Sequence, residues 1–242
     1  MEKQRLDHAL VARGLTSSRS QAENWIRLGK VTVDGKTLTK PGYFVRASAD
    51  VKLVAEEQYV SRAGLKLASV AKVLNLNFKD AVVLDVGSST GGFTDYSLRN
   101  GAKKVYAVDV GTEQLHPSLR GNERIELHEK TDIRDFIIEG DMPDIIVIDV
   151  SFISLREILP YIAKHLSAPN TQIAAMLKPQ FEAGRNQTNK GIIKNEAVRR
   201  QILKEFESWA KQYFVVRDKR DSDVAGAKGN QERFYLLTPL NK

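Results

Sequence analysis

The sequence predicts an α/β protein, in which a Rossmann-like, doubly wound and mostly parallel seven-stranded sheet follows a small basic α+β domain. Three observations support this prediction. Seven short apolar segments recur in the later part of the chain, and helical segments separate several of them, as crossover helices do in a parallel sheet. Residues 1–55 carry ten Lys and Arg against five Asp and Glu, whereas the remaining residues carry twenty-seven against twenty-five. This change in pattern and charge predicts two domains.

Length and composition favour a folded protein outside the membrane. The 242 residues are 42% hydrophobic and 28% charged, which leaves ample apolar surface for a core. The apolar runs are far shorter than the roughly 20 residues of a membrane span, and the N-terminus lacks an apolar signal segment. With no cysteine and four scattered histidines, the chain lacks disulfides, thiolate sites and metal-ligand spacing. We expect a cytoplasmic protein without membrane or metal, and its net charge of +7 favours a polyanionic partner.

The first 55 residues contain signals for a helix and a hairpin. Residues 17–28 place apolar side chains at helical spacing behind two serines that are N-cap candidates. Residues 30–36 alternate apolar and polar residues and end on Asp34-Gly35, which is typical of a hairpin turn. Residues 51–54 supply another short strand.

This segment resembles the S4 RNA-binding module, a small fold of helices and a hairpin. The residues that carry the resemblance are Arg5-Leu6-Asp7, Leu10, Gly14-Leu15, Ser18-Arg19, Ala22, Ile26, Gly29-Lys30-Val31 and Val33-Asp34-Gly35. The resemblance implies that a set of basic side chains faces RNA phosphates, namely Arg5, Arg13, Arg19, Arg27 and Lys30. The alternative is a solvated basic face without a ligand.

The second domain alternates strands and helices. Its candidate strands are 81–86, 104–109, 125–128, 144–149, 173–177, 213–217 and 233–237. Its helical stretches lie near 61–74, 93–100, 155–164 and 194–210. In such sheets, whose final strands can run antiparallel, ligands bind beyond the carboxyl ends of the parallel strands. The residues that end strands are therefore the informative ones.

The loop after the first of these strands favours S-adenosylmethionine over a dinucleotide. A dinucleotide fingerprint needs glycine at the position of Ser89, where the backbone approaches a pyrophosphate. S-adenosylmethionine has no pyrophosphate, and its amino-acid end can pair with a carboxylate and loop amides. Asp109 ends the second strand, where a carboxylate accepts hydrogen bonds from ribose hydroxyls. The alternative is a tight turn that needs glycine without any ligand.

Charged residues end two later strands. Asp149 follows four aliphatic residues, and Lys178 follows another apolar run. Charges at the mouth of a buried sheet are costly unless they are paired or functional, so a structural Asp149–Lys178 ion pair is one interpretation. The other is catalytic, and it adds Lys66 and Glu232 to form a tetrad of two lysines and two carboxylates.

This tetrad resembles the Lys-Asp-Lys-Glu set of the FtsJ-type RNA 2′-O-ribose methyltransferases, and the whole chain resembles the TlyA, or hemolysin A, family. The motifs that carry the resemblance are residues 61–66, 84–95, 149–155 and 178–182, joined to the S4 module. The resemblance implies S-adenosyl-L-methionine-dependent 2′-O-methylation of a ribosomal RNA cytidine. It implies catalytic roles for Lys66, Asp149, Lys178 and Glu232. Cofactor contacts are implied for Asp85, Gly87, Ser88, Ser89, Gly91, Gly92, Phe93, Asp109 and Asp132.

Two features depart from the family pattern. Asp132 stands where the family has asparagine, and the loop at 222–230 lacks an expected proline. Lys178 is the candidate base; in its protonated form it would instead orient the 2′-oxygen while a carboxylate or water takes the proton.

The remaining predictions concern RNA and domain limits. Further RNA contacts are predicted for Arg62 and for Arg185 and Lys190 in a polar loop, whose alternative is a solvated mobile loop. The predicted boundaries are 1–57 for the RNA-binding domain, 58–63 for a linker and 64–242 for the methyltransferase domain. The predicted partner is ribosomal RNA, with the large subunit favoured. Three alternatives stay open: a membrane-acting hemolysin, an RNA-binding factor without catalysis, and a small-molecule methyltransferase.

Overall fold

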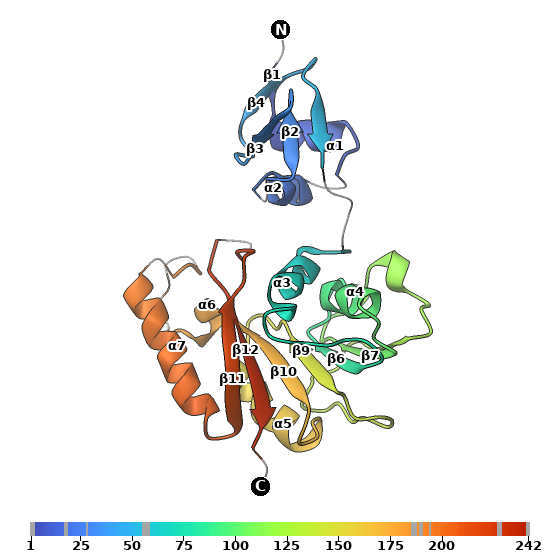
Figure 1. Cartoon of the computed structure of the whole chain (residues 1–242), viewed down its shortest axis with the longest axis vertical. Helices are drawn as coiled ribbons and strands as arrows, with labels where there is room; N and C mark the ends of the chain where they lie inside the picture. Colours follow the sequence, from blue (N-terminus) through green and yellow to red (C-terminus); the bar gives the residue numbers. More distant parts are fainter. Residues whose placement is uncertain are drawn as a thin grey trace. The chain divides into compact units, whose positions relative to one another are not determined.

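The structure, a computed structural model of the chain, divides into two compact units, Met1–Gln58 and Tyr59–Lys242 (Figure 1). It describes residues 3–16, 19–27, 29–54, 59–184, 188, 191–193, 195–226 and 229–240. Within these ranges, no helix combines the length and the apolar character that a membrane crossing requires. Nor do any three His, Asp or Glu side chains in these ranges gather as metal ligands would.

The described residues of the first unit form two helices and two small sheets. Its elements are β1 (Lys3–Arg5), α1 (Leu6–Ala12), α2 (Arg19–Arg27), β2 (Val31–Val33), β3 (Lys36–Leu38), β4 (Phe44–Arg46) and β5 (Val51–Leu53). Strands β3, β2 and β5 form one antiparallel sheet, and β1 pairs antiparallel with β4. The helices bury apolar side chains such as Leu6, Leu10 and Ile26.

The predicted helix and hairpin of this unit are confirmed. Asp34 and Gly35 both have positive φ, 50° and 78°, as a two-residue hairpin turn with the twist of its strands requires. The serines predicted as N-caps, Ser17 and Ser18, lie outside the described residues. The elements β1, α1 and β4 were not predicted, because three-residue strands and a seven-residue helix are too short to show a clear period.

The second unit is built on the predicted seven-stranded sheet. Its strands are β6 (Val82–Val86), β7 (Lys104–Val108), β8 (Ile125–His128), β9 (Ile145–Ile148), β10 (Gln172–Leu177), β11 (Phe214–Asp221) and β12 (Arg233–Pro239). The strand order is β11-β12-β10-β9-β6-β7-β8. Only β12 breaks the parallel arrangement, because it runs antiparallel to both β10 and β11.

Helices cover both faces of this sheet, which confirms the doubly wound fold (Figure 1). The helices are α3 (Arg62–Ala71), α4 (Gly92–Arg99), α5 (Leu155–His165), α6 (Pro179–Glu182) and α7 (Glu196–Ala210), with a 3-10 turn at Pro117–Leu119. Alternate strand residues face opposite cores: Leu84 packs with α5 and α7, whereas Val83 packs with α3 and α4. Strands buried on both faces explain the continuous apolar runs of the sequence.

Residues 59–63, which were all predicted to belong to the 58–63 linker, pack on the second unit. The backbone N–H of Val60 donates to Asp95 Oδ2 at 2.8 Å, and the rings of Tyr59 and Tyr96 lie 5.4 Å apart. The unit therefore begins ahead of α3.

Candidate active site

The candidate site lies at the carboxyl edge of the central strands. Strands β6, β7, β9 and β10 run in the same direction, so the loops that follow them share this edge. The loop after β6 approaches the end of β9 closely. A Cβ on Gly87 would lie 2.8 Å from the carbonyl oxygen of Asp149, and Gly87 has φ +80°. Glycine is therefore required here for both space and backbone conformation.

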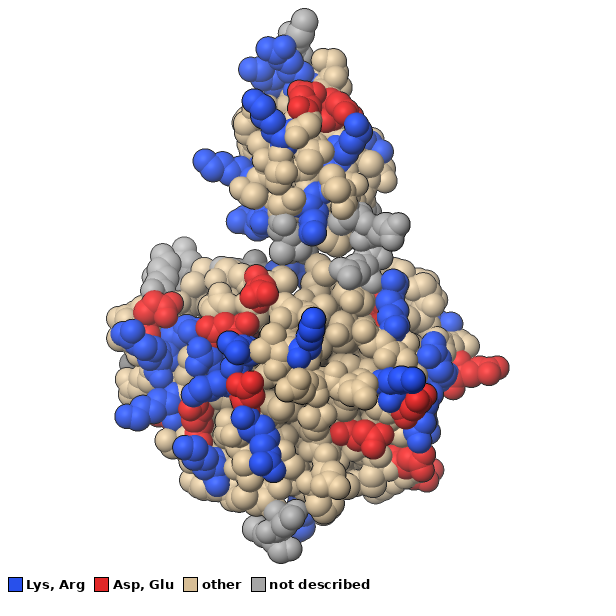
Figure 2. Space-filling view, in the orientation of Figure 1, with Lys and Arg blue, Asp and Glu red and all other residues tan. Residues whose placement is uncertain are grey.

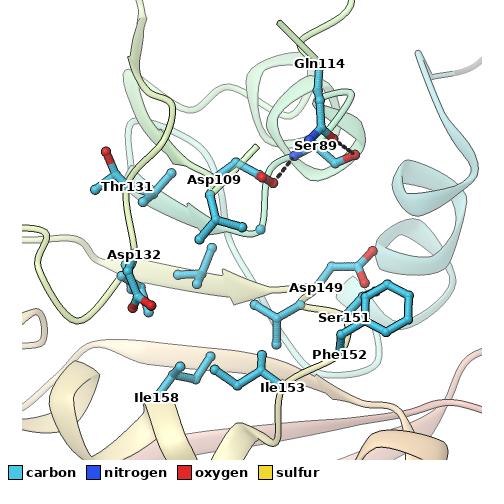
Figure 3. A pocket seen from close by; sticks show the side chains of 16 residues that line it. Ser89, Asp109, Gln114, Thr131, Asp132, Asp149, Ser151, Phe152, Ile153 and Ile158 are labelled. Carbon is cyan, nitrogen blue, oxygen red and sulfur yellow. Dashed lines mark hydrogen bonds between the residues drawn. The ribbon is translucent and has the colours of Figure 1, made fainter. Parts of the chain in front are cut away.

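Asp109 closes this loop from the neighbouring strand. Its carboxylate accepts a hydrogen bond from the backbone N–H of Ser89 at 2.8 Å (Figure 3). It accepts a second from the backbone N–H of Gly111 at 2.7 Å. Ser89, at the position where a dinucleotide fingerprint has glycine, has φ 46° and donates its hydroxyl to Gln114. Each carboxylate oxygen of Asp109 retains a lone pair for a ligand hydroxyl.

A cavity of about 380 Å³ opens beside Asp109, within the usual size of a small-molecule site. Its walls are mostly apolar and include Val110 and Ile133. Ile153 and Ile158 form another part of the wall (Figure 3). Of the predicted cofactor residues, the cavity is lined by Gly87, Ser89, Asp109 and Asp132. The carboxylate of Asp132 is held by Arg134 through both oxygens, at 2.9 and 2.6 Å.

The other predicted cofactor residues are not among those that line this cavity. Phe93 belongs to the core, a Cβ on Gly92 would meet Ser61 and Ala63, and Gly91 approaches Leu115. Ser88 is buried, and its Oγ has no hydrogen-bond partner among the described residues. These residues shape the loop and do not line the cavity.

Asp85 is a fully buried carboxyl group at the end of β6. Its Oδ2 accepts the Thr94 hydroxyl at 2.6 Å, whereas its Oδ1 has no partner among the described residues. The pKa of Asp85 is raised from 3.8 to about 7, chiefly by burial and also by the nearby carboxylates of Asp149 and Asp109, against the opposing hydrogen bonds from Thr94. Asp85 thus titrates near neutral pH next to the candidate site.

The four tetrad residues come together as two ion pairs. Lys66 Nζ lies 2.5 Å from Glu232 Oε2, and Lys178 Nζ lies 2.6 Å from Asp149 Oδ1. Three of them, Lys66, Lys178 and Glu232, line a second cavity of about 340 Å³. Asp149 lines the first cavity, so the Lys178–Asp149 pair joins the two.

Two residues of the 149–155 motif that had no predicted role, Ser151 and Phe152, line both cavities. Lys178 Nζ donates to Ser151 Oγ at 2.8 Å. Phe152 is 91% exposed, has φ 66°, and lies 5.1 Å from the ring of Phe181. Positive φ is rare for an aromatic residue and is typical of functional sites. A Phe beside a strand end was the available signal, but the sequence does not distinguish an exposed ring from a core ring.

Glu182, in the 178–182 motif, is a third residue near the tetrad that had no predicted role. Its side chain is 2% exposed, and it accepts hydrogen bonds from Ser154 Oγ and from the backbone N–H of Leu155, both at 2.7 Å. Burial raises the pKa of Glu182, against these hydrogen bonds. The residue connects the turn that follows Lys178 to the loop that carries Ser151 and Phe152.

Most predicted RNA contacts of the first unit have partners inside the protein. Arg5 and Arg19 both pair with Asp7, which is fully buried, at 2.8 and 3.0 Å. Their hydrogen bonds and charges hold the pKa of Asp7 far below its usual range against the effect of burial. Arg13 donates to the carbonyl oxygens of Ala49 and Ala47, at 2.7 and 2.9 Å. These three arginines thus stabilise the fold of the unit.

The remaining predicted RNA contacts differ in position. Arg27 and Lys30 are exposed. Arg62 donates to the carbonyl oxygen of Ala225 at 2.6 Å, which connects α3 to the loop ahead of Glu232. Arg185 and Lys190 lie outside the described residues.

Comparisons with known proteins agree with the division of the chain into two units. The FtsJ-like methyltransferase model matches residues 59–238, and the S4 domain model matches residues 4–51. YqxC of Bacillus subtilis, described as a candidate rRNA methyltransferase, is 42% identical over 98% of this chain and 85% of its own. The 23S rRNA (cytidine-2′-O)-methyltransferase TlyA of Campylobacter jejuni is 36% identical over 93% of this chain and 96% of its own.

A solved structure extends the likeness to three dimensions. A candidate hemolysin from Streptococcus thermophilus has a TM-score of 0.76 and 38% identity, and the match covers 100% of this chain and 90% of the other.

Proposed function

Because the chain belongs to the FtsJ-like methyltransferase family and carries an S4 domain, we propose that it methylates a cytidine 2′-hydroxyl of ribosomal RNA with S-adenosylmethionine. The observation that supports this most directly is the Lys178–Asp149 ion pair between the two cavities. One cavity has the features of a cofactor site, and the other holds the rest of the tetrad.

The residues of the first cavity fit S-adenosylmethionine. The cradle at Gly87 is one that a Cβ would fill, and Asp109 offers carboxylate oxygens to ribose hydroxyls. Val110 and Ile133 offer apolar walls to a base. When bound, the cofactor supplies an electrophilic methyl group.

Lys178 orients the nucleophile in this proposal. An ammonium carries three N–H groups; the contacts to Asp149 and Ser151 leave one for the ribose 2′-oxygen. In this orienting role of Lys178, the hydroxyl proton goes to a carboxylate of the tetrad or to water.

Ribosomal RNA of the large subunit is the proposed substrate. The Campylobacter relative, which is named for 23S rRNA, matches this chain over nearly its whole length. Such a substrate would place the protein in the cytoplasm.

The test uses methyl-labelled S-adenosylmethionine with separated, unmodified ribosomal subunits, followed by nuclease digestion and mass spectrometry. We expect a labelled 2′-O-methylcytidine from the large subunit and a loss of about 10²- to 10⁴-fold in rate for Lys178→Ala. The matched control is Lys104→Ala, which removes a lysine paired with Glu126 at the start of β7, the end of that strand away from the site. Labelled cofactor binding without label in either subunit would overturn the proposal.

A further inference from the structure

The β1–β4 ladder of the first unit exposes one of its faces. The register sets Lys3 opposite Arg46 and Arg5 opposite Phe44, with Val45 between the two outer β4 residues. Val45 is 2% exposed and points inward. Because side chains alternate along a strand and opposite residues share a face, the other four side chains lie on the outer side. We call this set, Lys3, Arg5, Phe44 and Arg46, the outer face.

Phe44 displays an aromatic ring on this face from a well-held backbone. It is 60% exposed, and the preceding Tyr43 is 47% exposed. The backbone N–H groups of Leu6 and Asp7 donate to the carbonyl oxygens of Tyr43 and Pro41, at 2.7 and 3.1 Å. A single exposed apolar residue is ordinary, but this ring has cationic residues beside and across from it.

Two cations of the outer face are available to a ligand. Lys3 and Arg46 are both exposed, and neither forms an ion pair with any described residue. Like charges directly opposite each other on a ladder destabilise it. Arg5, by contrast, is held by Asp7. In Figure 2, Lys and Arg side chains project from the first unit at many points.

We propose that the outer face binds unpaired RNA, with a base stacked on Phe44 and the adjoining phosphates on Lys3 and Arg46. Aromatic rings beside cations are the usual means of holding single-stranded RNA, because every base has a π face and every nucleotide a phosphate. An acidic protein would pair with the cations but has no need of the ring. The proposal rests on the proposed function only in taking ribosomal RNA as the natural ligand.

The test measures binding of the full chain to a 12-nucleotide oligocytidylate and to a 12-base-pair RNA duplex over a range of salt. Phe44→Ala is expected to weaken oligocytidylate binding about 5- to 150-fold, the loss typical of one stacked base, without changing the salt dependence. Phe44→Tyr is expected to retain binding, and the duplex is expected to respond little to either substitution. Equal affinity of Phe44→Ala and the original protein for oligocytidylate would overturn the proposal.

The cations have their own variants. The plot of log association constant against log salt concentration has a negative slope. Arg46→Gln is expected to make this slope shallower by about 0.7, the value for one phosphate contact on a single strand. Lys36→Gln, which removes an exposed cation from β3, is the matched control and is expected to keep the original slope. Equal slopes for Arg46→Gln and the control would exclude Arg46 from the interface and overturn its assigned role.

Lys3→Glu separates binding from folding. It sets opposite charges across the ladder, so the free protein is expected to gain stability while RNA binding weakens. Stronger or unchanged RNA binding would contradict the proposal.

The same variants with unmodified large subunits separate this proposal from the proposed function. If Phe44→Ala methylates the large subunit with an unchanged KM, the proposed role of the outer face is rejected and the proposed methyltransferase function stands. Phe44-dependent binding of oligocytidylate without methyl transfer to any ribosomal RNA would do the reverse.

Discussion

The carboxylate of Glu182 accepts a hydrogen bond from the backbone N–H of Leu155 at 2.7 Å. This bond connects the turn that begins at Lys178 with the first residue of α5. Between Asp149 and Leu155 the chain carries Ser151 and Phe152, so one buried carboxylate positions both sides of the tetrad cavity.

Loss of this connection is expected to lower the catalytic rate by more than the loss of stability alone would. Glu182→Ala removes the acceptor for Leu155 and Ser154, and we expect a loss of about 1–3 kcal/mol in the free energy of unfolding together with a fall in kcat. Glu182→Gln keeps one acceptor and is expected to recover part of both. Urea unfolding and single-turnover methyl transfer measure the two effects.

The control for this prediction is a destabilised variant away from the site. Ile202→Val, in the buried face of α7, is expected to cost about 0.5–1.5 kcal/mol and to leave kcat unchanged. If Glu182→Ala and Ile202→Val each lower kcat in proportion to the stability they lose, Glu182 has only a structural role.

The Lys66–Glu232 pair is expected to show strong coupling. Lys66→Met would leave the buried Glu232 carboxylate without its cation and cost about 3–5 kcal/mol. The double variant Lys66→Met/Glu232→Gln removes both charges and is expected to recover much of this loss. A double-mutant cycle from urea unfolding measures the coupling, and additive losses would contradict it.

Asp85 is expected to make stability fall as pH rises between about 5 and 7. Its pKa is about 7 in the folded protein and 3.8 ordinarily, so over this range the folded state holds a proton that the unfolded state has released. The free energy of unfolding then falls by up to about 1.4 kcal/mol per pH unit. Unfolding of Asp85→Asn across this range is expected to lack that slope.

Asp7 has the opposite effect on the pH dependence of stability, and it acts at lower pH. Its folded-state pKa is lowered, so its stabilising contribution is present above about pH 4 and is lost only as pH falls further. Asp7 therefore adds no pH dependence to the free energy of unfolding between pH 5 and 7.

If the free energy of unfolding depends on pH in the same way in the original protein and in Asp85→Asn, Asp85 is excluded as the titrating group.

Phe152 is expected to act on the substrate rather than on the fold. Because the ring is 91% exposed, Phe152→Ala is expected to change the free energy of unfolding by less than about 0.5 kcal/mol. If the ring stacks on a base beside the tetrad, kcat/KM falls about 5- to 150-fold. Labelled methyl transfer measures this, with Ile137→Ala, another exposed apolar residue, as the control. Equal activity of the two variants would exclude the stacking role.

The sequence by itself predicted the seven strands, the four longer helices of the second unit and the shared edge of the sheet at which Asp149 and Lys178 lie. These features follow from local periodicity and from the rule that parallel strands end together. The loop at Gly87 and the carboxylate of Asp109 were also readable, because each lies at a strand end.

Only the tertiary structure decided which charged and aromatic residues are available to a ligand. Arg13 and Arg46 look alike in the sequence, yet Arg13 donates to two carbonyl oxygens whereas Arg46 has no ion-pair partner among the described residues. Phe93 and Phe152 both follow strand ends, yet one is 1% exposed and the other 91%. The physical reason is that exposure and pairing depend on neighbours distant in the chain, which packing alone brings together.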